Sequence, residues 1–146
     1  MSSANRLRLF AASVLVLNVL ATVAAIAINL PSQFGMVGTD AASEFLTSGT
    51  AISAPLPPVA LLLLVVGLAG RRGLWGWVGI VAAYVAAVAV GIGGVGEMLA
   101  EPTEDTPRSV LVAAGVIWLM IAAALATLAT FVVSRRSPAT SQLSAN

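Results

Sequence analysis

The sequence predicts an all-α membrane protein: a four-transmembrane-helix antiparallel bundle with both termini in the cytoplasm. Hydrophobic residues make up 59% of the 146-residue chain and charged residues only 9%, against about 25% charged in an average soluble domain. A chain this short cannot bury so much apolar surface in a water-soluble fold. The remaining evidence is four long uncharged stretches, with connections that alternate between basic and acidic.

Each uncharged stretch reaches the roughly 20 residues that a helix needs to cross a bilayer. The predicted spans are 9–28, 51–70, 74–93 and 110–133. A transmembrane barrel strand would need alternating polar positions, and runs such as LLLLVVGLAG and VAAYVAAVAV have none. We therefore expect one domain over residues 1–133, followed by a disordered cytoplasmic tail over 134–146, which is small and polar.

The first span has an alternative interpretation as a secretory signal peptide. Arg6 and Arg8 precede its apolar run, and Ala25-Ile26-Ala27 resembles a small-residue cleavage site. The apolar run is longer than the usual core of a signal peptide, which favours a retained membrane helix.

Local signals mark the ends of the other spans. Pro55, Pro57 and Pro58 fall in the opening of the second span. The three-residue turn at 71–73 makes the second and third spans antiparallel neighbours. Thr106-Pro107 is typical of a helix start, which opens the fourth span. The loop 29–50 is long enough to carry a short helix, from Thr39 or Asp40 to near Gly49.

Charge placement predicts the orientation. Six of the seven arginines fall on one side of the predicted membrane and all six acids on the other. By the positive-inside rule, the arginine side faces the cytoplasm. The cytoplasmic topology determinants are Arg6, Arg8, Arg71, Arg72, Arg135 and Arg136. Arg108 is the exception, and acids of its own loop are its nearest predicted partners.

The chain has no His, Cys or Lys. This removes the usual zinc and haem ligands, thiol nucleophiles, Schiff-base lysines and the imidazole base. We expect no catalytic activity, no cofactor, no metal and no nucleic-acid partner. Residues 91–96, GIGGVG, match the letters of a dinucleotide fingerprint but follow a membrane helix where that motif needs a strand, so no nucleotide site is expected. They predict instead a helix end that loosens at the outer interface.

Small residues recur at every fourth position of the third span, at Gly79, Ala83, Ala87 and Gly91. Such a helix-packing stripe allows close approach of helix backbones in a membrane. We expect it to pack within the bundle, with contact to a second copy or to a partner membrane subunit as the alternative.

An outer acidic cluster follows the third span, comprising Glu97, Glu101, Glu104 and Asp105. Glu97 and Glu101 would share a face if the third helix continued beyond its glycines. The favoured interpretation is a solvated acidic loop, and the alternative is a site for a divalent cation.

Three side chains with hydrogen-bonding groups lie near the predicted midplane: Asn18, Tyr84 and Trp118. We expect this intramembrane polar cluster to include a clasp in which Asn18 faces inward toward the third or fourth span, with Tyr84 as its partner. The alternative is a neutral path for a small solute.

The functional prediction is a non-catalytic accessory, scaffold or interaction subunit in the lipid bilayer. The alternative is a small-solute transporter or channel with a neutral pathway near Asn18 and Tyr84, although ion-coupled carriers usually need an ionisable group inside the membrane. Arginine as the only basic residue, with abundant Ala, Val, Gly and Leu, favours a bacterial source and a plasma-membrane location.

Overall fold

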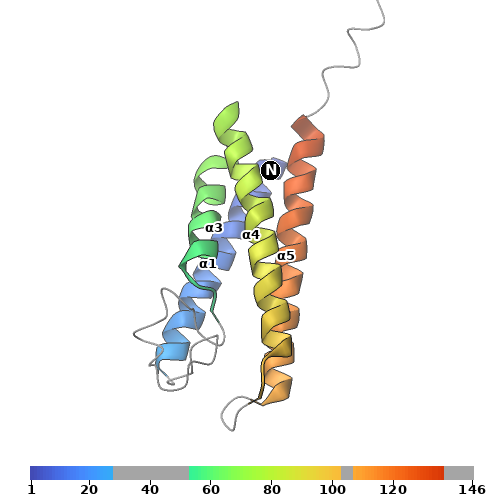
Figure 1. The fold of residues 1–146 in the computed structure, drawn as a ribbon. Helices are drawn as coiled ribbons and strands as arrows, with labels where there is room; N and C mark the ends of the chain where they lie inside the picture. The colour runs from blue at the N-terminus through green and yellow to red at the C-terminus, as the bar shows by residue number, and fades with distance from the viewer. Residues whose placement is uncertain (28–52, 103–106, 137–146) are drawn as a thin grey trace, which may run out of the picture.

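The described chain folds into four helices. A computed structural model describes residues 1–27, 53–102 and 107–136. The helices are α1 (Ser3–Ala27), α3 (Leu56–Leu68), α4 (Leu74–Leu99) and α5 (Arg108–Arg136). Successive helices run in opposite directions, so the start of α1, the α3–α4 turn and the end of α5 lie at the same end of the bundle (Figure 1).

Three of these helices are long and apolar enough to cross a membrane: α1, α4 and α5. The second predicted span is different, because α3 has only 13 residues and is about 20 Å long, against a hydrocarbon layer of about 30 Å. The prediction of four full-length spans is therefore wrong for 51–70. The loop helix expected near Thr39 to Gly49 and the tail from 137 onward lie outside the described residues.

Prolines account for the short α3. A helix starting at Ala51 would require N–H donors at residues 55, 57 and 58, and proline supplies none. Ser53 to Pro55 are not helical, and Pro55 precedes the helix with extended backbone angles. Pro57 and Pro58 then occupy the first turn, where a helix needs no N–H donors. The three prolines therefore shift the start of the helix from the predicted Ala51 to Leu56, about five residues later in the chain.

The other helices are longer than predicted. α1 begins at Ser3 and so contains Arg6 and Arg8, while α5 continues to Arg136, through the first three residues of the predicted tail. α4 runs unbroken through the glycines to Leu99, so the expected loosening at 91–96 is wrong. Gly94, in the middle of this stretch, is buried and faces α5.

Contacts join α1 to α3, α3 to α4, α4 to α5 and α5 back to α1, so the described helices form a closed ring. Gly73 turns the chain between α3 and α4 with a φ of 66°, a left-handed conformation that glycine adopts without strain. The core of the ring is rich in alanine, and α4 contributes Ala82, Ala83, Ala86 and Ala87 to it.

The most extensive helix contact is between α4 and α5. A methyl group added to Gly94 would lie 2.8 Å from the carbonyl oxygen of Gly115 and 3.1 Å from the Cβ of Trp118. Gly115 in turn faces Met98 and the carbonyl of Gly94. The two backbones thus approach through paired glycines, as small residues allow in membrane helices.

We expect Gly94→Ala to destabilise the bundle by about 1–3 kcal/mol, because backbone atoms of α5 occupy the space that the methyl group needs. Gly96→Ala is the matched control, since it lies in the same helix with nothing within 4 Å of an added Cβ. Unfolding of both variants in mixed micelles under a denaturing detergent measures the difference. Equal stability of the two variants would contradict the close contact.

Candidate functional site

Asn18 is the buried polar side chain in the middle of α1, with 6% of its surface exposed. Its Oδ1 accepts a hydrogen bond of 2.7 Å from the backbone N–H of Ala54. Ala54 belongs to the non-helical stretch before α3, so its N–H has no partner inside a helix. Asn18 therefore supplies the hydrogen-bond partner of a backbone N–H that lies just before α3, in the second predicted span.

Thr22 adds to this polar site from the next turn of α1. Its hydroxyl donates to the carbonyl oxygen of Asn18 at 2.8 Å, and Ser53 is buried in the stretch that Asn18 holds. The prolines at 55, 57 and 58 were the signal that could have located this site from sequence, because they imply a span whose helix starts late.

Tyr84 lies elsewhere. Its hydroxyl forms a hydrogen bond of 2.8 Å with Thr130 of α5, and 37% of its surface is exposed. The expected clasp between Asn18 and Tyr84 is therefore wrong, because the two side chains serve different helix pairs. Trp118 is buried at a third place, against Gly94 in the α4–α5 contact. The structure does not bring these three residues together.

The helix-packing stripe changes partner along α4. A Cβ on Gly79 would meet the backbone of Ala69 at the end of α3, whereas a Cβ on Gly91 would lie 3.7 Å from Ala122 of α5. Ala83 and Ala87 are buried between them. A four-residue spacing advances about 40° per step around a helix, or about 120° over this stripe. The stripe therefore winds from the α3 side to the α5 side, within one bundle.

The acidic cluster is described only in part. Glu97 is buried in the last turn of α4, while Glu101 lies beyond the helix end and is exposed. The helix does pass its glycines, but it stops before Glu101. Glu104 and Asp105 are outside the described residues. Among the residues that the structure describes, no group of three or more acids could hold a metal ion.

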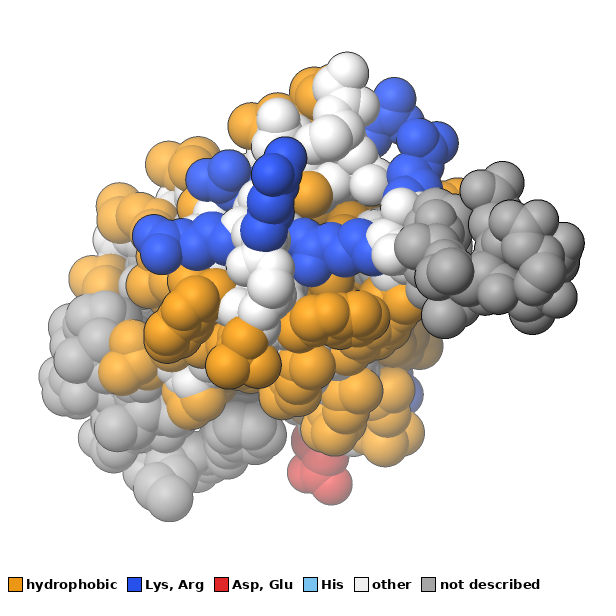
Figure 2. All heavy atoms as spheres, turned by 90° about the horizontal axis from the view of Figure 1, so that it is seen from above, with side chains coloured by type: hydrophobic (Ala, Val, Ile, Leu, Met, Phe, Trp, Pro, Cys, Tyr) orange, Lys and Arg blue, Asp and Glu red, His pale blue; other side chains and the backbone are white. Residues whose placement is uncertain are grey.

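The arginines predicted as topology determinants gather at one end of the bundle, which we call the basic end: Arg6, Arg8, Arg71, Arg72, Arg135 and Arg136 (Figure 2). Two of them also bind backbone. Arg8 Nε donates to the carbonyl of Val66 at 2.6 Å. Arg136 Nη2 donates to the carbonyls of Ala69 at 2.9 Å and Arg71 at 3.1 Å.

These bonds join α1 and α5 to the last turn of α3 and the residues after it. Carbonyl groups at a helix C-terminus lack partners within the helix and carry its partial negative charge, so cations bind well there. Arg108 does the same at the opposite end, where its Nη1 donates to the carbonyl of Ala100 after α4 at 3.0 Å. Its predicted pairing with acids of its own loop involves Glu104 and Asp105, which lie outside the described residues.

We expect Asn18→Leu to destabilise the bundle by about 1–2 kcal/mol, because it leaves the Ala54 N–H unpaired in an apolar setting. Tyr84→Phe is the comparison variant and should cost less, about 0.5 kcal/mol, because Thr130 keeps its bond to the carbonyl of Ala126. Thermal unfolding in mild detergent gives both values. A smaller effect for Asn18→Leu than for Tyr84→Phe would refute the role given to Asn18.

Comparison with protein-family models, with curated proteins and with solved structures finds no match to this chain. The hydrogen-bonding side chains of the described helices mostly bind backbone atoms: Asn18 binds Ala54, and Arg8, Arg108 and Arg136 bind carbonyls at helix ends. The chemistry that this arrangement supports is the fixing of helices in a membrane.

Proposed function

We propose that this protein is a small multi-pass membrane protein that acts without catalysis, as an accessory, scaffold or interaction subunit. The observation that carries the proposal is the use of its intramembrane polar groups. Asn18 binds the Ala54 backbone, and Thr22, Thr127 and Thr130 donate to carbonyls of their own helices. Such groups stabilise a bundle and leave few donors for a substrate.

The outward face of α4 supports an interaction role. Five of its large apolar residues, at spacings of four and three, are between 46% and 68% exposed: Val81, Val85, Val88, Ile92 and Val95. This surface fits lipid or the helix of another membrane protein, because neither requires polar contacts. A second copy of this chain and a different membrane subunit are the two kinds of partner that the surface admits.

A small-solute transporter is the second candidate function, and one observation favours it. The chain is not helical at Ser53 to Pro55, beside the buried Asn18, and transporters commonly place their sites where a membrane helix is interrupted. A path of this kind would pass Asn18, Thr22 and Ser53. Tyr84 would not contribute, because it bonds Thr130 on another face.

We propose a plasma-membrane location in a bacterium, with the basic end in the cytoplasm. The support is the separation of charge along the bundle. Six arginines lie at the basic end, and the described acids Glu97 and Glu101 follow the glycines at the far end of α4. The positive-inside rule relates such an asymmetry to orientation.

Reporter fusions test this orientation. We expect a reporter that works only in the cytoplasm to be active after Asn146 and within the turn at Gly73. A reporter that works only outside the cytoplasm should be active within 34–49 and at Thr103. The reverse pattern at either pair of positions would overturn the proposed orientation.

Purification in mild detergent tests the function. We expect the tagged protein to retain a second membrane protein, or a second copy, in a fixed ratio, and the protein alone in liposomes to conduct no small neutral solute. Solute flux that Asn18→Leu abolishes, with stability retained, would replace the accessory role by the transporter role. Gly96→Ala is the control for flux, since it lies in open space.

A further inference from the structure

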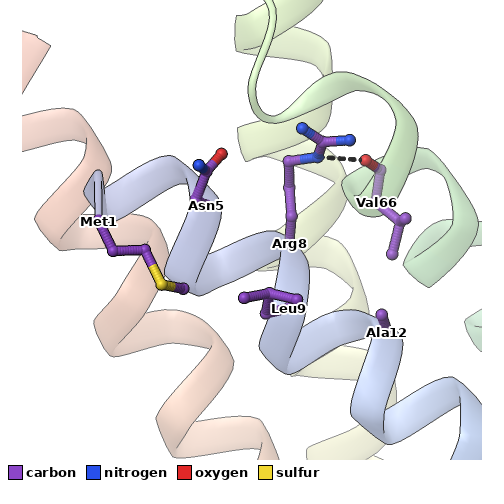
Figure 3. A pocket seen from close by; sticks show the side chains of 6 residues that line it. All are labelled: Met1, Asn5, Arg8, Leu9, Ala12 and Val66. Carbon is purple, nitrogen blue, oxygen red and sulfur yellow. Dashed lines mark hydrogen bonds between the residues drawn. The ribbon is translucent and has the colours of Figure 1, made fainter.

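A pocket opens between α1 and α3 at the basic end (Figure 3). Its volume is about 320 Å³, and its lining residues are Met1, Asn5, Arg8, Leu9, Ala12 and Val66. Asn5 and Arg8 lie toward the end of the bundle, with Leu9 and Ala12 farther along α1 (Figure 3). The pocket is therefore polar toward the helix end and apolar toward the middle of the helix.

Arg8 lines this pocket, and most of its hydrogen-bonding capacity is unused within the described residues. A guanidinium has five N–H donors, and Nε uses one of them on the Val66 carbonyl. In the part of the chain that the structure describes, no acceptor is recorded for the two terminal nitrogens. A planar pair of free N–H donors matches two oxygens of a phosphate group.

The position of the guanidinium is fixed by its surroundings. The bond to Val66 holds one side, and the side chain passes over Gly70, where an added Cβ would lie 2.9 Å from Nη1 and 3.1 Å from Cδ. Gly70 thus leaves the space that Arg8 occupies. A donor group held in place before binding loses less freedom when a ligand arrives.

The charge around the pocket is positive. Arg6, Arg71 and Arg72 share this end of the bundle with Arg8 (Figure 2), and the acids that the structure describes, Glu97 and Glu101, lie at the opposite end. Trp75 and Trp77, in the first turn of α4, are more than 45% exposed, as is typical of aromatic residues at the headgroup level. In a membrane-embedded bundle, the pocket mouth would therefore be at the depth where lipid phosphates lie.

We propose that this pocket binds an anionic phospholipid, with the phosphate on the terminal nitrogens of Arg8, the headgroup near Asn5 and one acyl chain along Leu9, Ala12 and Val66. The apolar half of the pocket would have no role for a free phosphate, and the surplus of arginines favours a headgroup with net negative charge. The inference requires that the helices lie in a membrane, and it holds for either candidate function.

Native mass spectrometry of the full chain in detergent tests the site, with phosphatidylglycerol and phosphatidylcholine as matched probes. We expect at least tenfold more phosphatidylglycerol than phosphatidylcholine to be retained, and Arg8→Gln to lower phosphatidylglycerol binding about tenfold. Arg72→Gln is the control, because it removes the same charge from the same end and has an exposed side chain outside the pocket. It should change binding less than twofold.

A second variant separates the site from folding. Ala12→Phe fills the apolar half of the pocket and keeps Arg8, so it should lower phosphatidylglycerol binding with the helix content unchanged. Equal losses for Arg8→Gln and Arg72→Gln, equal retention of both lipids, or displacement of the lipid by millimolar inorganic phosphate would overturn the proposal. Failure of the protein to integrate into membranes would count against the proposed function instead.

Discussion

Backbone groups left over at helix ends need hydrogen-bond partners, and the hydrocarbon layer of a membrane supplies none. Beside three of the described helix ends, a side chain supplies that partner. Asn18 accepts from Ala54 before α3, Arg136 donates to Ala69 after α3, and Arg108 donates to Ala100 after α4. Each of these bonds joins two segments of the chain, so the positions of the three side chains help to fix the arrangement of the helices.

A second constraint, close packing, explains why α4 takes part in the two most extensive helix contacts. Dispersion contacts and close backbone approach hold helices together in lipid, where the hydrophobic effect between them is absent. The alanines and glycines of α4 provide that approach to α3 at Gly79 and to α5 at Gly94. Because its small-residue stripe winds around the helix, one element contacts two neighbours along its length.

Composition and charge were sufficient to predict long apolar helices, and the three helices that are long and apolar enough to cross a membrane have the expected positions and are longer than predicted. Helix ends were harder to predict. Polar residues such as Arg6 and Arg8 begin α1, although hydropathy alone excludes them. Helix α4 continues through the glycines at 91–96, where the α5 backbone packs against Gly94. The second span was overestimated because its apolar run hides the loss of helix donors at three prolines.

The hydrogen-bond partners of side chains across the bundle could not be predicted from the depth of each residue in the membrane. Asn18 and Tyr84 lie at similar predicted depths in the membrane, but depth does not indicate which neighbouring helix a side chain faces. The ring order of the helices separates them, since α1 contacts α3 and α5, while Tyr84 faces α5 from α4. The arginine bonds to Val66 and Ala69 were missed for the same reason, because they depend on which helix end lies beside each arginine.

The pairing of α1 with α3 has a consequence for how the bundle resists sliding. Surfaces of Leu, Val and Ala look nearly alike after a shift of one helical turn, so apolar contact alone sets the axial register of two membrane helices weakly. Here Arg8 forms a hydrogen bond with Val66, and Asn18 forms one with Ala54. The two bonds lie about 15 Å apart along α1. A one-turn slip of about 5.4 Å would break both bonds together, so these two contacts set the axial register of α3 and the residues before it against α1.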